Sequence, residues 1–239
     1  MTPTRASALP VDANLQVRLL GGFALHRGDA ALSIPAAGRR LVALVALRDR
    51  GVSRVQAAGV LWGESSDERA CGSVRTVLWA LRKGGINIID AAGGTLTLAR
   101  DIDVDVRVMT SVANGLLAGQ VRAQDVNLEL FAEDLLPDWY DEWLASDRER
   151  LRQLRLNALE AMSASLVSAG QVHAAVQAAL CAVASEPLRE SANRVLIEAY
   201  LAEGNRADAL RHFRSFAQLL SRELGLRPTQ PLVDLVRAG

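Results

Sequence analysis

The hydrophobic positions between residues 67 and 83 repeat with the period of an α-helix. Past Glu68 this stretch contains no acidic residue, whereas surface helices usually mix both charge signs. The pattern therefore predicts a helix with a cationic outward face, which is typical of a solvated surface helix or of a helix that lies in a DNA groove. The apolar face carries Ala70, Val74, Val77, Leu78 and Leu81, and the opposite face carries Gly72, Arg75, Thr76, Trp79, Arg82 and Lys83.

Strand patterns flank this helix on both sides. Residues 15–25 alternate and then break at Gly21-Gly22, and residues 31–34 form a return strand after a turn, which predicts a small N-terminal antiparallel sheet. Residues 86–91 and 95–99 flank Gly93-Gly94 and predict a β-hairpin. In this hairpin we expect Leu96 and Leu98 to face inward and Thr95 and Thr97 to face outward.

Two further helices are predicted between these strands, at residues 38–48 and 54–61. Ser53 is a plausible N-cap for the second of them. Arg39 and Arg40 lie at the start of the first helix, where the helix dipole disfavours cations, and this placement suggests a phosphate contact. The order is thus a sheet, three helices and a hairpin.

Strand patterns disappear after residue 105. Helices are predicted at residues 106–117, 121–131 and about 141–169, with Arg148, Arg150, Arg152 and Arg155 on the solvent side of the last and Gly170 at its end. Gly170 and Gly204 are 34 positions apart, and Ala175 aligns with Ala209. This period is typical of tetratricopeptide (TPR) repeats, in which helix pairs stack into an array. Residues 231–236 are expected to cap the array.

The charge is distributed unevenly along the chain. The 239 residues have a formal net charge of zero. Residues 39–83 contain nine basic and four acidic residues, a local charge of +5, whereas the part from residue 106 onward is net −3. Phosphate contact requires local rather than overall positive charge, so the asymmetry indicates two parts with different roles.

Residues 1–13 are polar and lack the apolar middle of a secretion signal, and no apolar run approaches the ~20 residues of a membrane span. We therefore expect a disordered lead-in and a cytoplasmic protein. Cys71 and Cys181 are expected to be small packing residues rather than a disulfide.

No catalytic constellation, phosphate-binding glycine loop or clustered histidines occur in the sequence, which predicts a protein that is not an enzyme and needs no cofactor or metal. Asp101, Asp103 and Asp105 are spaced like calcium ligands. The glycine and terminal glutamate of an EF-hand loop are missing, however, so an acidic strand or linker is the favoured interpretation.

The run of residues 41–99, which contains ERACGSVRTVLWALR, resembles the DNA-binding half of the Streptomyces antibiotic regulatory protein (SARP) family. The resemblance implies an OmpR/PhoB-type winged helix-turn-helix, an α+β fold, at residues 14–105. The segments LLPDWYDEWLASDRERLRQLRLNALEAM and EPLRESANRVLIEAYLAEGNRADALRHF resemble the bacterial transcriptional activator domain of the same family, which implies an all-α, TPR-like domain at residues 106–239.

The resemblance to this family implies a sequence-specific activator that binds direct repeats in double-stranded promoter DNA, as a homodimer, and contacts the RNA polymerase holoenzyme. Arg75 is the best candidate for base recognition, because arginine can grip guanine O6 and N7 together. Arg82, Lys83, Arg69 and Ser73 are candidates for phosphate contact, and Thr76 for a phosphate or a thymine methyl. Arg54, Thr95 and Arg100 complete the predicted DNA-binding set with Trp79, for which groove contact and packing between domains are equally plausible.

Two alternatives stay open. In the first, the repeat domain is a protein-interaction scaffold and the winged helix does not bind DNA; in the second, the protein is an enzyme of unknown type. Trp139, Tyr140 and Trp143 are interpreted as an aromatic cluster that anchors the long helix, and contact with a second protomer or RNA polymerase is the alternative.

Overall fold

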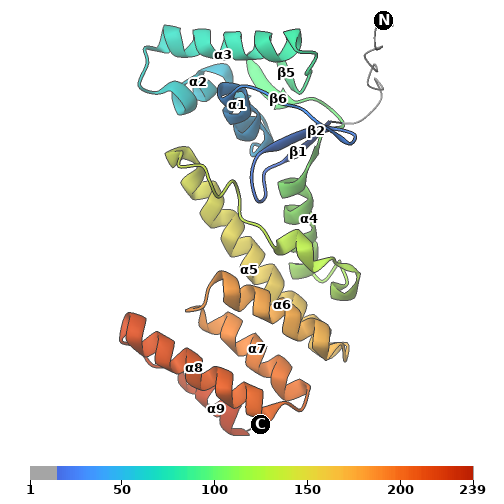
Figure 1. The fold of residues 1–239 in the computed structure, drawn as a ribbon, viewed down its shortest axis with the longest axis vertical. Coiled ribbons are helices and arrows are strands. Elements are labelled where there is room, and N and C mark those ends of the chain that lie inside the picture. The colour runs from blue at the N-terminus through green and yellow to red at the C-terminus, as the bar shows by residue number, and fades with distance from the viewer. Residues whose placement is uncertain (1–14, 239) are drawn as a thin grey trace, which may run out of the picture. The chain divides into compact units, whose positions relative to one another are not determined.

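The computed structural model describes residues 15–238, so the predicted lead-in at residues 1–13 lies outside the described part. The described residues divide into two compact units. One contains the chain up to Arg107 together with Leu135–Asp147, and the other contains Val108–Asp134 together with the chain from Arg148 onward. The fold is mostly helical with a small β region near the N-terminus (Figure 1). Within residues 15–238 no helix has both the length and the apolar character needed to cross a membrane.

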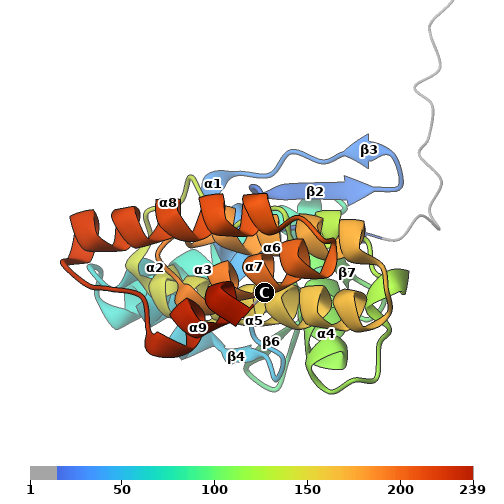
Figure 2. The same ribbon diagram turned by 90° about the horizontal axis from the view of Figure 1, so that it is seen from below.

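The N-terminal sheet has four strands in the order β3-β2-β1-β7. Strands β1 (Leu15–Arg18), β2 (Ala24–Arg27) and β3 (Ala30–Ala31) are antiparallel, as predicted, and β2 and β3 lie side by side in Figure 2. Strand β7 (Asp103–Val104) comes from the acidic run and pairs in parallel with β1. The run therefore supplies a strand, which agrees with the favoured interpretation of its three aspartates.

Asp105 follows β7 and ties this sheet to the start of α4 (Asp105–Leu117). Its carboxylate accepts hydrogen bonds from the backbone N–H groups of Leu19 and Leu20, each at 2.9 Å, and from that of Val106 at 2.7 Å. Burial raises the pKa of Asp105 above its ordinary value, while these hydrogen bonds act in the opposite direction. The carboxylate thus satisfies three backbone donors where the end of β1 meets a helix.

Helix α1 (Ala36–Ala46) begins directly after Pro35, two residues before the predicted start, and its residues 41–46 are all buried. Arg39 donates to the backbone oxygen of Ile34 at 3.0 Å. Arg40 donates to the backbone oxygen of Leu61 at 3.2 Å and forms an ion pair with Asp141. Both guanidinium groups thus have a partner within the protein, although Arg39 is exposed, and the phosphate contact suggested for them stays a prediction.

Helix α2 (Arg54–Trp62) starts at a capping box. The Ser53 hydroxyl accepts from the Gln56 N–H at 3.1 Å, and the Gln56 side chain accepts from the Ser53 N–H at 3.2 Å, so the predicted N-cap is confirmed. We expect Ser53→Ala to lower the free energy of unfolding by about 1 kcal/mol, because the Gln56 N–H at the helix start loses its side-chain acceptor. Urea titration would measure this loss, with the exposed Ser65→Ala as the control; equal stabilities of the two variants would contradict it.

A second sheet has the strand order β4-β6-β5. Strands β5 (Ile89–Ala92) and β6 (Thr95–Leu98) form the predicted hairpin, in which Leu96 is buried and Thr97 exposed. The sequence analysis did not predict the third strand, β4 (Val52–Ser53), which pairs with β6 just before α2 begins. Gly51, at φ +76°, precedes it, and a Cβ there would lie 2.7 Å from the backbone oxygen of Leu96, so only glycine fits.

The segment Leu135–Asp147 packs on the N-terminal unit. The Leu136 N–H donates to the backbone oxygen of Leu19 at 2.8 Å, and Trp139 stacks on Phe23 with ring centroids 6.0 Å apart. Tyr140 is 93% exposed, so the predicted aromatic cluster is wrong for this residue. Trp139 anchors the segment to the N-terminal sheet region instead.

Ion pairs with arginines of the N-terminal unit hold the same segment. Asp141 binds Arg40, and Asp147, which is buried, binds Arg48 at 2.9 Å. Both arginines belong to α1 or the turn that follows it, which explains why cations are retained around this otherwise apolar helix.

The second unit departs from prediction between α4 and the long helix. The helix predicted at residues 121–131 is wrong: the chain forms two 3₁₀ turns, at Ala123–Asp125 and Leu128–Phe131. Asn127 lies between them, and its side-chain oxygen accepts from the Glu129 N–H at 3.0 Å, a local bond that competes with continuous helix.

The long helix α5 (Ala145–Ser168) begins after a short 3₁₀ turn at Glu142–Leu144. Arg155 was predicted on its solvent side, but it is only 5% exposed and pairs with Asp134 at 2.7 Å. A buried arginine persists because its charge is matched by a carboxylate, here one that itself reaches solvent.

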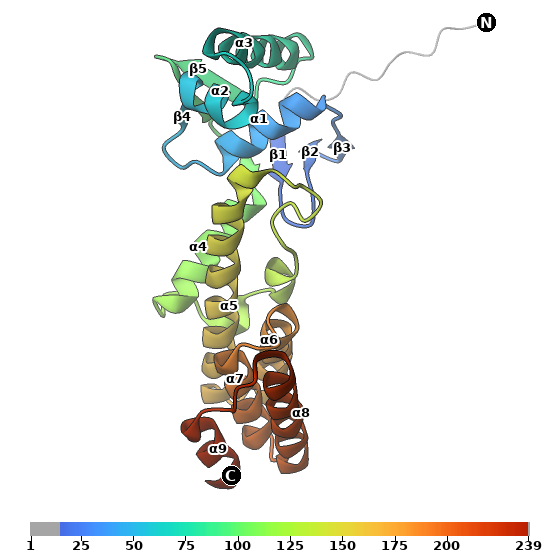
Figure 3. The same ribbon diagram turned by 90° about the vertical axis from the view of Figure 1, so that its left-hand side faces the viewer.

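Helices α6 (Val172–Ser185), α7 (Glu190–Ala202), α8 (Arg206–Leu224) and α9 (Gln230–Ala238) complete the unit. The starts of α6 and α8 are separated by the predicted 34 positions, and Ala175 and Ala209 are both fully buried. Helix α9 packs against α7 and α8, as expected for a cap (Figure 3). Its apolar contacts join a core cluster of Ile197, Ala209, Phe216, Leu220, Leu232 and Val236.

His212 on α8 faces Asn193 on α7. The Asn193 amide nitrogen donates to the backbone oxygens of Pro187 and Arg189, so its side-chain oxygen accepts from His212 Nε2 at 2.8 Å. Burial lowers the pKa of His212 below its ordinary 6.5, because the charged imidazolium is poorly solvated there.

We expect this histidine to make the helical unit less stable in acid. The unfolded chain takes up a proton before the folded chain does, so the stability from neutral His212 is present above pH 6.5 and is lost as pH falls through the lowered pKa. Thermal unfolding at a series of pH values would measure the loss. His212→Gln keeps a donor toward Asn193 but does not titrate, and an undiminished acid loss in this variant would contradict the assignment.

Candidate nucleic-acid interface

Helix α3 (Asp67–Lys83) has the predicted bounds and carries more basic residues than α1 or α2. Asp67 and Glu68 lie in its first turn and Arg82 and Lys83 in its last, the arrangement that the helix dipole favours at both ends. Its buried face, formed by Ala70, Val74, Leu78 and Leu81, packs on α2 and α1. This packing fixes which side of α3 faces solvent.

Four cations project from the solvent side of α3. Arg69, Arg75, Arg82 and Lys83 are exposed, and among the described residues none of them forms an ion pair or a side-chain hydrogen bond. Lys83 Nζ lies 4.7 Å from the ring centroid of Trp79, which is itself 61% exposed. The helix thus presents an exposed indole and positive charge that no carboxylate in the described part of the chain neutralises.

Helical geometry divides these side chains into a centre and two flanks. Positions 75 and 82 are seven residues apart and share one flank, whereas positions 69, 73 and 76 share the other. Trp79 and Lys83 lie between them, farthest from the buried face. If such a helix lies in the major groove of DNA, its cations face the phosphate backbones on both sides of the groove.

The two hydroxyl residues are less available than the sequence suggested. The Ser73 hydroxyl donates to the Arg69 backbone oxygen and the Thr76 hydroxyl to that of Gly72, both at 3.1 Å. Each proton is therefore used within α3, and a hydrogen bond to a phosphate would first require the hydroxyl to rotate.

The remaining predicted residues lie on the second sheet or beside it. Arg54 donates through its guanidinium to the backbone oxygen of Ala91 at 3.2 Å, and its N–H donates to that of Gly94 at 2.9 Å, so it holds the hairpin onto α2. Thr95 is half-buried in β6 opposite Ser53, and Arg100 is exposed after β6. Arg54 is thus mainly a structural residue here, whereas Arg100 is accessible.

Arg50 was not singled out from the sequence. It is exposed in the turn before β4 and forms no ion pair among the described residues. The excess of positive charge over residues 39–83 includes Arg50, but the sequence pattern did not predict strand β4, which follows its turn.

Comparison with known proteins defines the class of this chain. Residues 103–238 match the family model of the bacterial transcriptional activator domain, so the chain belongs to that family. The SARP-type assignment made from the sequence is confirmed.

Two relatives of this chain are regulatory proteins of Streptomyces species. The chain is 26% identical over 244 residues to the regulatory protein AfsR of Streptomyces griseus, covering 97% of this chain and 25% of AfsR. It is 29% identical over 212 residues to AfsR of Streptomyces coelicolor, covering 82% of this chain and 21% of that protein. The chain therefore spans a quarter or less of the length of these relatives.

Among solved structures, the fold resembles that of Mycobacterium tuberculosis EmbR in complex with a low-affinity phosphopeptide. The TM-score is 0.75 at 21% identity, over 95% of this chain and 65% of the EmbR chain. At this identity the likeness establishes the fold.

Proposed function

We propose that this protein is a sequence-specific DNA-binding activator in which α3 enters the major groove of promoter DNA. The observation that carries the proposal is the cationic surface of α3, where Arg69, Arg75, Arg82 and Lys83 reach solvent without an acidic partner among residues 15–238. Cations left unpaired on one face are available to replace the counterions of DNA phosphates.

The elements around α3 support a winged helix-turn-helix of the OmpR/PhoB type. Helices α1, α2 and α3 are followed by the β5–β6 hairpin, which would act as the wing, and a four-stranded sheet precedes them. In this proposal the DNA-binding domain covers residues 14–105, and the activator domain, with its 34-residue TPR-like period, covers residues 106–239. Arg100 and Thr95 would reach DNA from the wing region, and Arg50 is added to the candidates.

The proposed partners follow from membership of the family. The protein would act in the cytoplasm, bind direct repeats as a homodimer and contact RNA polymerase through its helical domain. Direct repeats require a head-to-tail arrangement of protomers, with half-sites about one helical turn, or 10 base pairs, apart.

Genome-wide mapping of bound sites, followed by gel-shift titration of the recovered sequences, tests the proposal. We expect repeated motifs with helical-turn spacing and an affinity that falls steeply as salt rises. Binding that is insensitive to both sequence and salt would instead favour a protein-interaction scaffold.

A further inference from the structure

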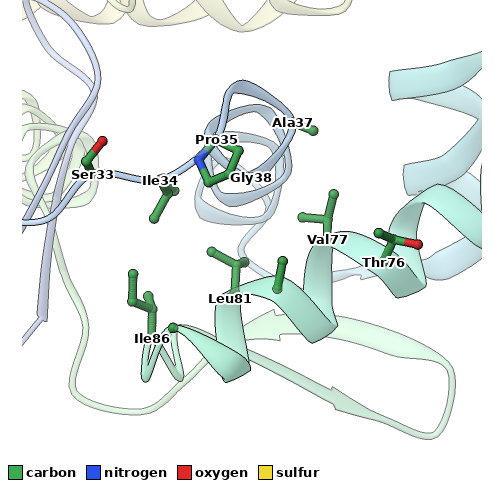
Figure 4. A pocket seen from close by; sticks show the side chains of 11 residues that line it. Ser33, Ile34, Pro35, Ala37, Gly38, Thr76, Val77, Leu81 and Ile86 are labelled. Atoms are coloured by element: carbon green, nitrogen blue, oxygen red, sulfur yellow. The ribbon is translucent and has the colours of Figure 1, made fainter.

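A pocket of about 420 Å³ opens between the start of α1 and the second half of α3 (Figure 4). Its floor consists of buried residues, among them Ile34, Leu81 and Ile86, which are 4%, 4% and 8% exposed. Its rim consists of residues that reach solvent, including Pro35 and Ala80. The volume is within the range of small-molecule sites and far above the gaps of ordinary packed cores.

Gly38 contributes to the size of the pocket. It lies inside α1, where glycine lowers helix stability relative to alanine, and it is buried. A Cβ there would lie 3.6 Å from both Ile34 and Leu81, which is ordinary contact, so packing does not require glycine at this position. The missing side chain leaves space open against the floor.

The lining selects an uncharged, apolar ligand. None of the lining residues carries a charge, and the only side-chain polar groups are the hydroxyls of Ser33 and Thr76. The Thr76 hydroxyl already donates to the Gly72 backbone oxygen. A charged ligand would lose its hydration here and gain no counter-charge, whereas an apolar one would be removed from water.

The pocket also adjoins the proposed DNA-binding surface. Thr76 and Ala80 on its rim share the flank of α3 that carries Arg69 and Ser73, opposite the flank of Arg75 and Arg82. A ligand that fills the pocket and reaches its rim would occupy space between this flank and one wall of the groove.

We propose that this pocket binds a neutral, apolar small molecule and that its occupancy weakens DNA binding through α3. The binding site stands on the pocket alone, while the effect on DNA rests on the proposed function. The ligand acts as an inducer or feedback signal, because it is displaced when α3 engages DNA.

Titration of the full chain with N-phenyl-1-naphthylamine, an uncharged fluorophore that brightens in apolar sites, tests the pocket. We expect saturable binding that weakens at least about tenfold in Gly38→Leu, which fills the floor, and in Ala80→Leu, which narrows the rim. Ala207→Leu adds the same side chain at an exposed position of α8 and should bind the probe as the unmodified protein does. Thermal unfolding establishes that each variant is folded.

The proposed site would be overturned if the probe does not bind saturably, or if all variants bind it equally well. It would also be overturned if replacing Leu9 and Val11 by serine raises the affinity for the probe tenfold. The last result would mean that the chain's own first residues occupy the pocket.

The regulatory effect is tested by measuring DNA binding with and without the probe. A saturating concentration of probe should weaken DNA binding at least about fivefold in the unmodified protein and leave DNA binding by Gly38→Leu unaffected. Independent binding of probe and DNA would overturn the coupling. Probe binding by a protein that never binds DNA would overturn the proposed function and retain the site.

Discussion

Replacement of Arg75 by alanine is expected to weaken binding to the protein's own promoter site by about 1–3 kcal/mol, or roughly fivefold to 150-fold. Arg75 is exposed on a flank of α3 and is not held by any carboxylate among the described residues. If the guanidinium of Arg75 binds guanine, its removal eliminates two hydrogen bonds to the base at once. The loss of affinity should therefore be largest for the preferred DNA sequence. Sequence preference should relax at one base-pair position.

Lys83→Ala provides the contrast. Lys83 lies at the end of α3 beside Trp79, where a phosphate contact is the natural role. Its loss should weaken binding to all sequences to a similar extent and reduce the slope of log affinity against log salt by about one. Gel-shift titrations of both variants at several salt concentrations, with preferred and scrambled sites, would separate the two roles.

The matched control is Arg214→Ala. Arg214 is also an exposed helical arginine without an ion pair among the described residues, but it lies on α8 of the helical unit. Its removal changes the net charge by the same amount and should leave DNA affinity unchanged. If Arg214→Ala weakens binding as much as Arg75→Ala, the effect is one of overall charge and the placement of α3 in the groove is wrong.

Asp105→Ala is expected to destabilise the N-terminal unit by about 3 kcal/mol. The substitution removes the side-chain acceptor of three backbone N–H groups, those of Leu19, Leu20 and Val106. A buried donor without a partner costs about 1–3 kcal/mol, and Leu19 is fully buried. Urea unfolding followed by circular dichroism would measure the loss.

Two variants make the Asp105 experiment specific. Asp105→Asn retains one side-chain acceptor and should lose less than half as much stability. Asp103→Ala removes an exposed carboxylate of the same acidic run and should change stability little. Equal losses in Asp103→Ala and Asp105→Ala would show that the run acts through its charge and not through the hydrogen bonds of Asp105.

The sequence predicts a helix or hairpin well where a single local pattern determines its type and its bounds. The bounds of α3 follow from its helical period and its acidic first turn, and the β5–β6 hairpin follows from alternation around Gly93-Gly94. The repeat is predicted by Gly170 and Gly204 because each adopts a positive φ just before a new helix, at +73° and +81°.

Long-range pairing is what the patterns miss. Strands β4 and β7 have two residues each, too few to show alternation, and both exist because a partner strand elsewhere in the chain accepts them. Arg155 falls at a position that helical spacing assigns to solvent, but Asp134 draws it into the protein. Such errors arise because tertiary contacts override local periodicity.

The same limit applies to the candidate site. An excess of basic residues identifies a cationic segment, but it does not show which of these side chains form hydrogen bonds or ion pairs within the protein. Arg39, Arg40 and Arg54 are engaged by backbone oxygens or by Asp141, whereas Arg75, Arg82 and Lys83 are left accessible. Only coordinates separate these two groups, because the engaged arginines pair with groups up to 101 positions away.

The N-terminal unit is formed by two separate stretches of the chain, and this has a consequence for biosynthesis. Strand β7 and the segment Leu135–Asp147 complete that unit, yet a ribosome makes them well after α3. At roughly 5–20 residues per second, the nascent chain waits several seconds with Phe23 and the acceptor backbone of Leu19 uncovered. Gene fragments that stop before Leu135 should therefore yield aggregation-prone polypeptides that depend on chaperones, and expression trials are better served by boundaries beyond Asp147.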